Sequence, residues 1–278
     1  MTDAATHLLS GDALNRLIDF VYCRTGMRFG RNKRYYIERR VAERMAATGS
    51  RDFDRYHSLV RADADEAQKL INSFTINETY FYREEHQLRC LSRSMLPEIV
   101  RDRRPGDLVR IWSMPCSTGE EAYSIALWLL ENWAMVDVYR IEIVGCDIDT
   151  DAVVAAMRGL FGTRALSKLP PAIVDAYFEP ETAGVREIID DLKESVKFTT
   201  CNLFDDASMA LMGQYDVIFC RNLLIYFDEE SRKVAARHLH RALKPGGYLC
   251  LGHTESMSRI SDQFELRRFP DAITYRRC

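Results

Sequence analysis

The sequence has no Cys-x-x-Cys pair, although it contains eight cysteines. Disulfide frameworks and zinc sites use characteristic cysteine spacings, and none of them occurs here. Most of the cysteines fall in or directly after apolar, strand-like runs, which is typical of small buried hydrophobic residues. These cysteines are Cys116, Cys146, Cys201, Cys220 and Cys250. We therefore expect free thiols and a cytoplasmic protein.

A targeting segment and long apolar runs are also missing. The first seven residues lack the basic start and apolar core of a signal peptide, and no apolar run approaches the roughly 18 residues that span a bilayer. The six histidines form no His-Glu-x-x-His or other metal-binding pattern. We expect a protein that does not insert into membranes and binds no metal ion.

The sequence has no strong charge of one sign. Lys and Arg number 38 against 41 Asp and Glu, which gives a net charge of −3. Surfaces that bind nucleic acid are usually strongly basic, so we expect no nucleic-acid partner. The first 75 residues differ from the rest, because they hold 13 Lys and Arg against 10 Asp and Glu and are mildly basic.

Residues 1–75 predict an all-helical domain. Apolar residues recur at helical spacing and glycines separate the runs, which predicts three or four helices between residues 11 and 75. A further helix is expected at 84–101, before the turn signal Arg-Pro-Gly-Asp at 104–107.

Residues 76–278 alternate strands with helices. We expect strands at 108–114, 141–147, 196–201, 215–220 and 248–252, and helices near 119–131, 150–158 and 228–243. This alternation predicts a doubly wound α/β sheet. The Lys-Pro-Gly-Gly run at 244–247 predicts a turn before the last parallel strand. The tail from 264 to 275 predicts an antiparallel edge hairpin. The stretch at 160–195 is too long for an ordinary connection, so we expect an inserted subdomain with a helix at 171–178 and a strand at 185–189.

Polar residues follow three of the predicted strands. In an open parallel sheet, ligands bind beyond the carboxyl ends of the strands, so the residues at 117–121, 147–149 and 221–222 predict a cofactor crevice. The first of these loops, Ser-Thr-Gly-Glu-Glu, is not the Gly-x-Gly-x-x-Gly fingerprint of dinucleotide sites. Either Ser117 or Thr118 fits a capping box with one glutamate. Two glutamates favour a ligand with an ammonium or sulfonium group, such as S-adenosylmethionine.

Each of the other two loops has two interpretations. An acid at the end of the second strand either accepts hydrogen bonds from ribose hydroxyls or caps the next helix. Asp149 lies directly before that helix, so we expect Asp149 to cap it and Asp147 to bind the ligand. Asn222 fits either a cap of a turn or a polar contact in the crevice. Tyr226 fits either a core position with its hydroxyl at the surface or a position in the crevice.

Five motifs, in this order, resemble the chemotaxis receptor methyltransferases of the CheR type. The likeness covers nearly the whole chain, from about residue 14 to the end. The motifs are Asn-Glu-Thr-Tyr-Phe-Tyr-Arg-Glu at 77–84, Cys-Ser-Thr-Gly-Glu-Glu-Ala-Tyr-Ser at 116–124, Asp-Ile-Asp at 147–149, Cys-Arg-Asn-Leu-Leu-Ile-Tyr-Phe at 220–227 and Gly-His-Thr-Glu-Ser at 252–256.

The resemblance implies a Rossmann-like methyltransferase sheet at 76–278, with a small inserted β subdomain at about 160–195, behind an N-terminal helical domain at 1–75 that recognises the receptor. It implies transfer of a methyl group from S-adenosylmethionine to glutamate side chains of methyl-accepting chemotaxis receptors, giving glutamate methyl esters and S-adenosylhomocysteine. Arg83 and Tyr226 match the pair closest to the methyl group. The positions that match the family's cofactor pocket are Asn77, Thr79, Arg83, Glu121, Asp147, Asn202, Leu203, Arg221 and Asn222.

The resemblance also bears on partners. Lys33, Arg40 and Arg44 lie within about 40° on a helical wheel, and alone they favour a solvated face. The methylation regions of chemoreceptors are acidic helical bundles, so the resemblance implies that these three cations form a docking surface for the receptor.

The loop at 179–184 looks shorter than the loop with which some relatives dock a receptor's C-terminal pentapeptide, so we expect no such docking, and we expect a monomer. The alternatives are a methyltransferase for another protein or nucleic acid, and a non-catalytic S-adenosylmethionine-binding protein.

Overall fold

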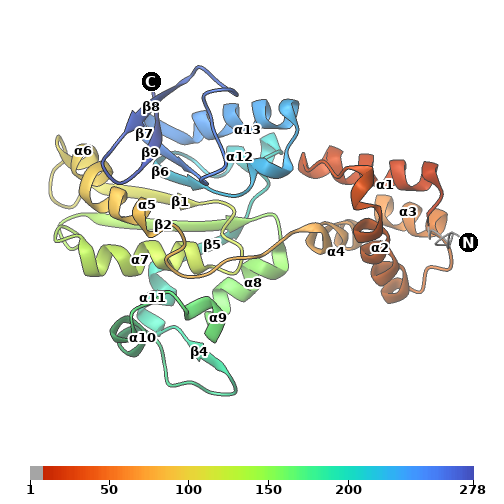
Figure 1. Cartoon of the computed structure of the whole chain (residues 1–278), viewed down its shortest axis with the longest axis horizontal. Helices are drawn as coiled ribbons and strands as arrows, with labels where there is room; N and C mark the ends of the chain where they lie inside the picture. Colours follow the sequence, from red (N-terminus) through yellow and green to blue (C-terminus); the bar gives the residue numbers. More distant parts are fainter. Residues whose placement is uncertain (1–8) are drawn as a thin grey trace, which may run out of the picture.

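The structure is a computed structural model that describes residues 9–278, with the N-terminal helices to one side of an α/β sheet (Figure 1). Four helices form the N-terminal domain, within the three or four that the sequence predicted. They are α1 (Gly11–Thr25), α2 (Arg34–Thr48), α3 (Phe53–Ala62) and α4 (Ala64–Phe74), and a short 3-10 turn, η1 (Arg31–Lys33), leads into α2. The side chains of Ser10, Asp52 and Asp63 accept backbone hydrogen bonds at the starts of α1, α3 and α4, because the first N–H groups of a helix lack partners within it.

A buried ion pair joins the helices of this bundle. The Arg44 guanidinium on α2 donates two hydrogen bonds to the Glu66 carboxylate on α4, from Nε to Oε1 at 3.0 Å and from Nη2 to Oε2 at 2.5 Å. Glu66 is only 5% exposed, and the Tyr56 hydroxyl on α3 also donates to it, at 2.9 Å. Arg44 is therefore a structural link between helices.

The sheet has seven strands in the order β5-β2-β1-β6-β7-β9-β8. The first five of these are parallel, and β9 and β8 form the antiparallel edge hairpin that the tail predicted. From β1 the chain moves outward through β2 to β5, then returns to β6 on the other side of β1, so the strand order reverses between β1 and β6. The bounds are β1 (Leu108–Ser113), β2 (Arg140–Asp147), β5 (Val196–Thr200), β6 (Tyr215–Cys220), β7 (Leu243–Leu251), β8 (Phe264–Arg268) and β9 (Ile273–Arg277).

One strand departs from the expectation. We expected a turn at 244–247, but β7 begins at Leu243 and includes these residues. The pairing with β6 shifts register between Tyr215 and Val217, so the Lys-Pro-Gly-Gly segment is accommodated as an irregularity within the strand.

Both faces of the sheet are covered by helices and packed with apolar side chains (Figure 1). Successive residues of β1 point to opposite faces, because side chains alternate along a strand: Ile111 packs into one core and Trp112 into the other. A helix interrupted by a π turn precedes β1, as expected for 84–101. The helices are α5 (Glu85–Cys90), η2 (Leu91–Met95), α6 (Leu96–Val100), α7 (Glu120–Asn132), α8 (Thr150–Arg158), α12 (Asp206–Ala210) and α13 (Glu229–Ala242).

The long connection between α8 and β5 holds the expected short helix and strand in a subdomain with a two-stranded antiparallel sheet. Its aromatic side chains pack around Phe81, whose ring centroid lies 4.8 Å from that of Phe161 and 5.4 Å from that of Phe178. The subdomain therefore supports the segment that carries Arg83. Its elements are β3 (Leu160–Gly162), α9 (Thr163–Leu166), α10 (Pro171–Tyr177), β4 (Val185–Glu187) and α11 (Asp190–Ser195). Among residues 9–278, no helix is both long enough and apolar enough to cross a membrane.

Replacing Arg44 with Ala should lower the free energy of unfolding by about 1–3 kcal/mol, because the buried Glu66 carboxylate loses its guanidinium partner. Urea unfolding followed by circular dichroism measures this. Arg39→Ala is the matched control, since Arg39 is exposed and lies 3.8 Å from Glu43, which is exposed as well. Equal unfolding midpoints for the two variants would contradict a structural role for Arg44.

Candidate functional site

The predicted site residues gather in one crevice at the carboxyl ends of the central strands, where the strand order reverses and ligands commonly bind. The crevice consists of two adjoining hollows of about 600 Å³ and about 540 Å³, which share Ile76, Pro115, Ser117 and Asn222 as lining residues. The first hollow is lined by the predicted residues Asn77, Asp147, Asn202, Leu203, Asn222 and Tyr226. The second is lined by Thr79, Arg83, Glu121, Arg221 and Asn222.

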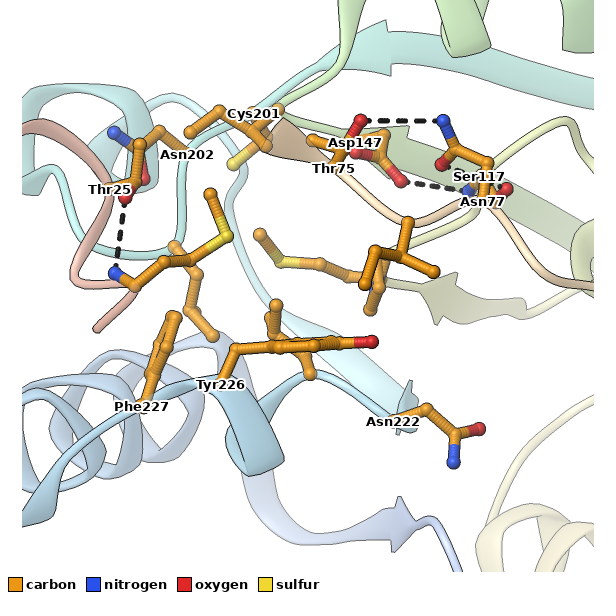
Figure 2. Close-up of a pocket in the computed structure, with 17 residues that line it drawn as sticks. Thr25, Thr75, Asn77, Ser117, Asp147, Cys201, Asn202, Asn222, Tyr226 and Phe227 are labelled. Atoms are coloured by element: carbon orange, nitrogen blue, oxygen red, sulfur yellow. Dashed lines mark hydrogen bonds between the residues drawn. The ribbon is translucent and has the colours of Figure 1, made fainter. Parts of the chain in front are cut away.

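Asp147 lines the first hollow at the end of β2 (Figure 2). It is 3% exposed, and its carboxylate accepts hydrogen bonds from the backbone N–H groups of Ser117 (2.8 Å) and Asp149 (2.9 Å). Burial raises the pKa of Asp147 to about 6, although these N–H groups oppose the shift. The carboxylate is thus fixed in orientation at the strand end.

Asp149 caps α8, as the sequence predicted. Its Oδ1 accepts hydrogen bonds from the backbone N–H groups of Asp151 (3.0 Å) and Ala152 (3.1 Å). Its Oδ2 accepts from the Asn77 side-chain amide, at 2.8 Å, and from the Thr75 hydroxyl, at 2.5 Å. Asp149 therefore positions Asn77 while Asp147 lines the hollow.

The two glutamates of the first loop do not form a capping box. Gly119 precedes α7 with a φ of 98°, and no side chain caps the helix. Thr118 instead donates to the Glu120 carboxylate, at 2.7 Å. Glu121 points into the crevice, where its carboxylate accepts hydrogen bonds from the Ser113 hydroxyl (2.7 Å) and from Arg221 Nη1 (2.8 Å).

Arg221 is the centre of a buried ion cluster at the wall of the second hollow. Its side chain is 3% exposed and lies 2.8 Å from Glu121 and 3.3 Å from Glu84, and Nη2 donates to the Arg83 carbonyl at 2.8 Å. Burial raises the pKa of Glu121, and the Arg221 charge opposes this shift. With all three side chains ionised, the cluster of Glu84, Glu121 and Arg221 carries one net negative charge, which suits a cationic ligand group.

Arg83 lines the second hollow and Tyr226 lines the first. Arg83 Nη1 donates to the Glu78 carbonyl, at 2.7 Å, and its guanidinium lies 5.8 Å from the centroid of the Tyr80 ring. Tyr226 ends the 3-10 turn η3 (Leu224–Tyr226), and burial raises the pKa of its hydroxyl. Tyr226 therefore stays a neutral hydrogen-bonding group at physiological pH.

The helical domain contributes a wall that the sequence did not predict. Thr25, the last residue of α1, and Met27, two residues farther on, line the first hollow together with Thr75. Met27 forms an antiparallel bridge with Phe227, and the Asn202 side-chain amide donates to the Arg24 carbonyl at 2.7 Å. No motif or residue spacing in the sequence predicts these contacts, because they depend on how the helical domain packs against the sheet domain.

The remaining walls of the first hollow are apolar. Met27, Met114, Ile148, Leu203 and Phe227 line it beside Asp147. An apolar space with a fixed carboxylate beside it suits an adenosine, whose base is flat and largely apolar on its faces and whose ribose offers two hydroxyl donors. The donor set of the crevice therefore fits S-adenosylmethionine.

The three predicted docking cations lie outside both hollows. Lys33 is exposed at the start of α2. Arg40 is partly buried, with its guanidinium 5.2 Å from the centroid of the Tyr36 ring and 3.5 Å from Glu43. Arg44 is paired with Glu66, as described above. Lys33 is therefore exposed and Arg40 pairs with an exposed glutamate, whereas Arg44 pairs with the buried Glu66.

Two family models together match most of the chain. The model described as "CheR methyltransferase, all-alpha domain" matches residues 12–75, and "CheR methyltransferase, SAM binding domain" matches residues 77–273.

Curated relatives match over nearly their whole length. Chemotaxis protein methyltransferase 2 of Vibrio cholerae is 46% identical over 262 residues, which are 94% of this chain and 91% of that protein. The chemotaxis protein methyltransferase of Salmonella typhimurium is 35% identical, over 93% of this chain and 88% of that protein. The chemotaxis protein methyltransferase of Escherichia coli is 33% identical, over 93% of this chain and 89% of that protein. With both family models and these relatives covering it, the chain belongs to the CheR methyltransferase family and uses S-adenosylmethionine as its cofactor.

Proposed function

We propose that the protein methylates the side-chain carboxylates of specific glutamates in methyl-accepting chemotaxis receptors, giving glutamate methyl esters and S-adenosylhomocysteine. The observation that carries the proposal is the pairing of an apolar hollow, lined by a fixed carboxylate and by Tyr226, with an adjoining hollow that the Arg83 guanidinium lines. S-adenosylmethionine supplies a methyl group bonded to a positively charged sulfur.

Within this proposal, the first hollow holds the adenosine. The Asp147 carboxylate accepts hydrogen bonds from the ribose hydroxyls, and Asn202 and Leu203 border the adenine. The ion cluster around Arg221 and Glu121 favours the ammonium group, because it carries a net negative charge in a place with little water. Asn77, Thr79 and Asn222 complete the lining between the two hollows.

The attacking group needs no general base. A glutamate side chain has an ordinary pKa near 4.3 and is already a carboxylate at neutral pH. Arg83 can hold this carboxylate by charge-assisted hydrogen bonds, and the Tyr226 hydroxyl can orient it. The reaction brings an anion to a cation, so alignment of the reacting atoms in a water-poor site is the main contribution of the protein.

Incubation with labelled S-adenosylmethionine and a panel of receptor cytoplasmic domains tests the proposal, with base-labile methyl esters as the product. Arg83→Ala and Tyr226→Phe should lower kcat by about tenfold or more, because each removes a hydrogen bond to the attacking carboxylate, and should leave the cofactor Kd nearly unchanged. Tyr139→Phe is the control, since Tyr139 stacks on Trp133 away from the crevice. Absence of methyl esters with every receptor would reject the proposed substrate.

The Asp147 carboxylate should make cofactor binding depend on pH. Its folded pKa lies above the ordinary value of 3.8, so its stabilising contribution to folding is present below about pH 4 and is lost as the pH rises through 6. Cofactor binding requires the charged carboxylate, so the cofactor affinity should rise as the pH rises. The Kd for S-adenosylhomocysteine should therefore be about tenfold weaker at pH 5 than at pH 7 by calorimetry. In Asp147→Asn the affinity should be low and flat with pH; a wild-type pH profile in this variant would exclude Asp147 as the ribose acceptor.

We further propose that residues 1–75 recognise the receptor through Lys33 and Arg40, while residues 76–278 hold the cofactor. Arg44, the third predicted cation, is occupied by Glu66. Exposed cations attract an acidic helix over roughly a Debye length and increase the rate of encounter.

The double variant Lys33→Glu/Arg40→Glu should raise the receptor KM several-fold and leave the cofactor Kd unchanged, because these residues lie outside the crevice. Steady-state methylation at several salt concentrations measures this, and the difference from wild type should shrink at high salt. Arg101→Glu/Arg104→Glu changes the net charge equally at exposed positions of the other domain. The same KM change in both double variants would indicate a general charge effect.

The inserted subdomain offers little support for peptide docking. Its two strands have three residues each, and Thr182 and Val185 close the chain between them with reciprocal hydrogen bonds of 2.9 and 3.1 Å. We propose that the enzyme acts as a cytoplasmic monomer, without a receptor C-terminal pentapeptide and without nucleic acid. Including receptor domains with and without that pentapeptide in the panel tests this, and faster methylation of the longer form would contradict it.

A further inference from the structure

Glu255 has no place in the proposed chemistry, yet it joins the two loops that follow β6 and β7. Its Oε2 accepts hydrogen bonds from the backbone N–H groups of Asn222 (2.7 Å) and Gly252 (2.8 Å). Its Oε1 accepts a third, from the N–H of Leu224 (2.7 Å). Glu255 lines neither hollow of the crevice, so it does not itself touch the cofactor or the reacting carboxylate.

The segment that Glu255 holds is the one that carries residues into the crevice. Asn222 lines both hollows, and Leu223 and Tyr226 line the first. Figure 2 shows Asn222 and Tyr226 together on the side of the hollow opposite Asp147. The backbone at Asn222 has a φ of 60°, which costs energy for a residue other than glycine and persists only where surrounding contacts enforce it. The hydrogen bond from Asn222 N–H to Glu255 is such a contact.

The end of β7 is shaped to admit the Glu255 carboxylate. A Cβ atom on Gly252 would lie 2.8 Å from Glu255 Oε2, 3.0 Å from Asn222 Nδ2 and 3.1 Å from the Asn222 backbone nitrogen. All three distances are too short for ordinary contact. The absence of a side chain at residue 252 therefore lets the loop after β6 approach the carboxylate closely.

Only a carboxylate satisfies three N–H donors at this junction. Two oxygens provide about four acceptor sites, whereas the glutamine amide has one oxygen and an NH₂ group that only donates. If the amide oxygen took the place of Oε2, the NH₂ group would face the N–H of Leu224, donor against donor. Glutamine therefore preserves the size of the side chain and breaks the junction.

We propose that Glu255 is a positioning residue for methyl transfer, which fixes the loop from Asn222 to Tyr226 and so sets where the Tyr226 hydroxyl stands in the crevice. This inference rests on the proposed role of Tyr226. It differs from a contribution to stability alone, which would lower the melting temperature and leave kcat unchanged in the folded enzyme.

The first test compares Glu255→Gln with Glu265→Gln, an exposed residue of the β8 strand. Glu255→Gln should lower kcat by about tenfold or more at saturating cofactor and receptor, measured well below its melting temperature, and Glu265→Gln should leave kcat unchanged. Gly252→Ala should also lower kcat, because the added Cβ would displace the Glu255 carboxylate. Wild-type kcat in folded Glu255→Gln would overturn the proposal.

The second test asks whether Glu255 acts through Tyr226. If it does, Tyr226→Phe should cost at least about fivefold less in the Glu255→Gln background than in wild type, because the hydroxyl is already misplaced there. Equal costs in the two backgrounds would overturn this inference and leave the role of Tyr226 standing. A wild-type kcat in Tyr226→Phe alone would overturn both the role of Tyr226 and this inference.

Discussion

The buried guanidinium of Arg221 ties together the parts of the chain that build the crevice. It pairs with Glu84 from the segment before α5 and with Glu121 from α7, and it follows directly after β6. A charge that is 97% shielded from solvent requires partners, since an isolated buried ion is very costly. The second hollow, the loop after β1 and the segment with Arg83 therefore keep their relative positions as long as this cluster stays intact.

Sequence reasoning reached the fold and the crevice for physical reasons. Hydrophobic periodicity reports secondary structure directly, so the strands at 215–220 and 264–275 and the helix at 150–158 were found where the structure has them. Parallel strands bring their carboxyl ends to one edge, so the sequence alone predicts that Glu121, Asp147 and Asn222 lie near one another.

The sequence could not show the contacts between segments that are distant in sequence. The pattern at 117–121 left a capping box and a ligand site both open, and the choice between them depends on Arg221, which is 100 residues away from Glu121 and pairs with it. Arg44 fitted a basic stripe on a helical wheel, but a wheel does not show Glu66 on another helix. Glu255 lies in the Gly-His-Thr-Glu-Ser motif at 252–256, yet only the folded chain shows that its carboxylate accepts hydrogen bonds from three backbone N–H groups.

The contribution of Thr25 and Met27 to the wall of the first hollow limits how the two domains can evolve or be recombined. The family models divide the chain at about residue 76 into an all-alpha domain and a SAM binding domain. A chimaera joined at that point would replace one wall of the first hollow together with the four N-terminal helices. Borrowed helices can therefore be grafted only if they also reproduce the turn at Gly26, which packs on Phe204, and the bridge from Met27 to Phe227.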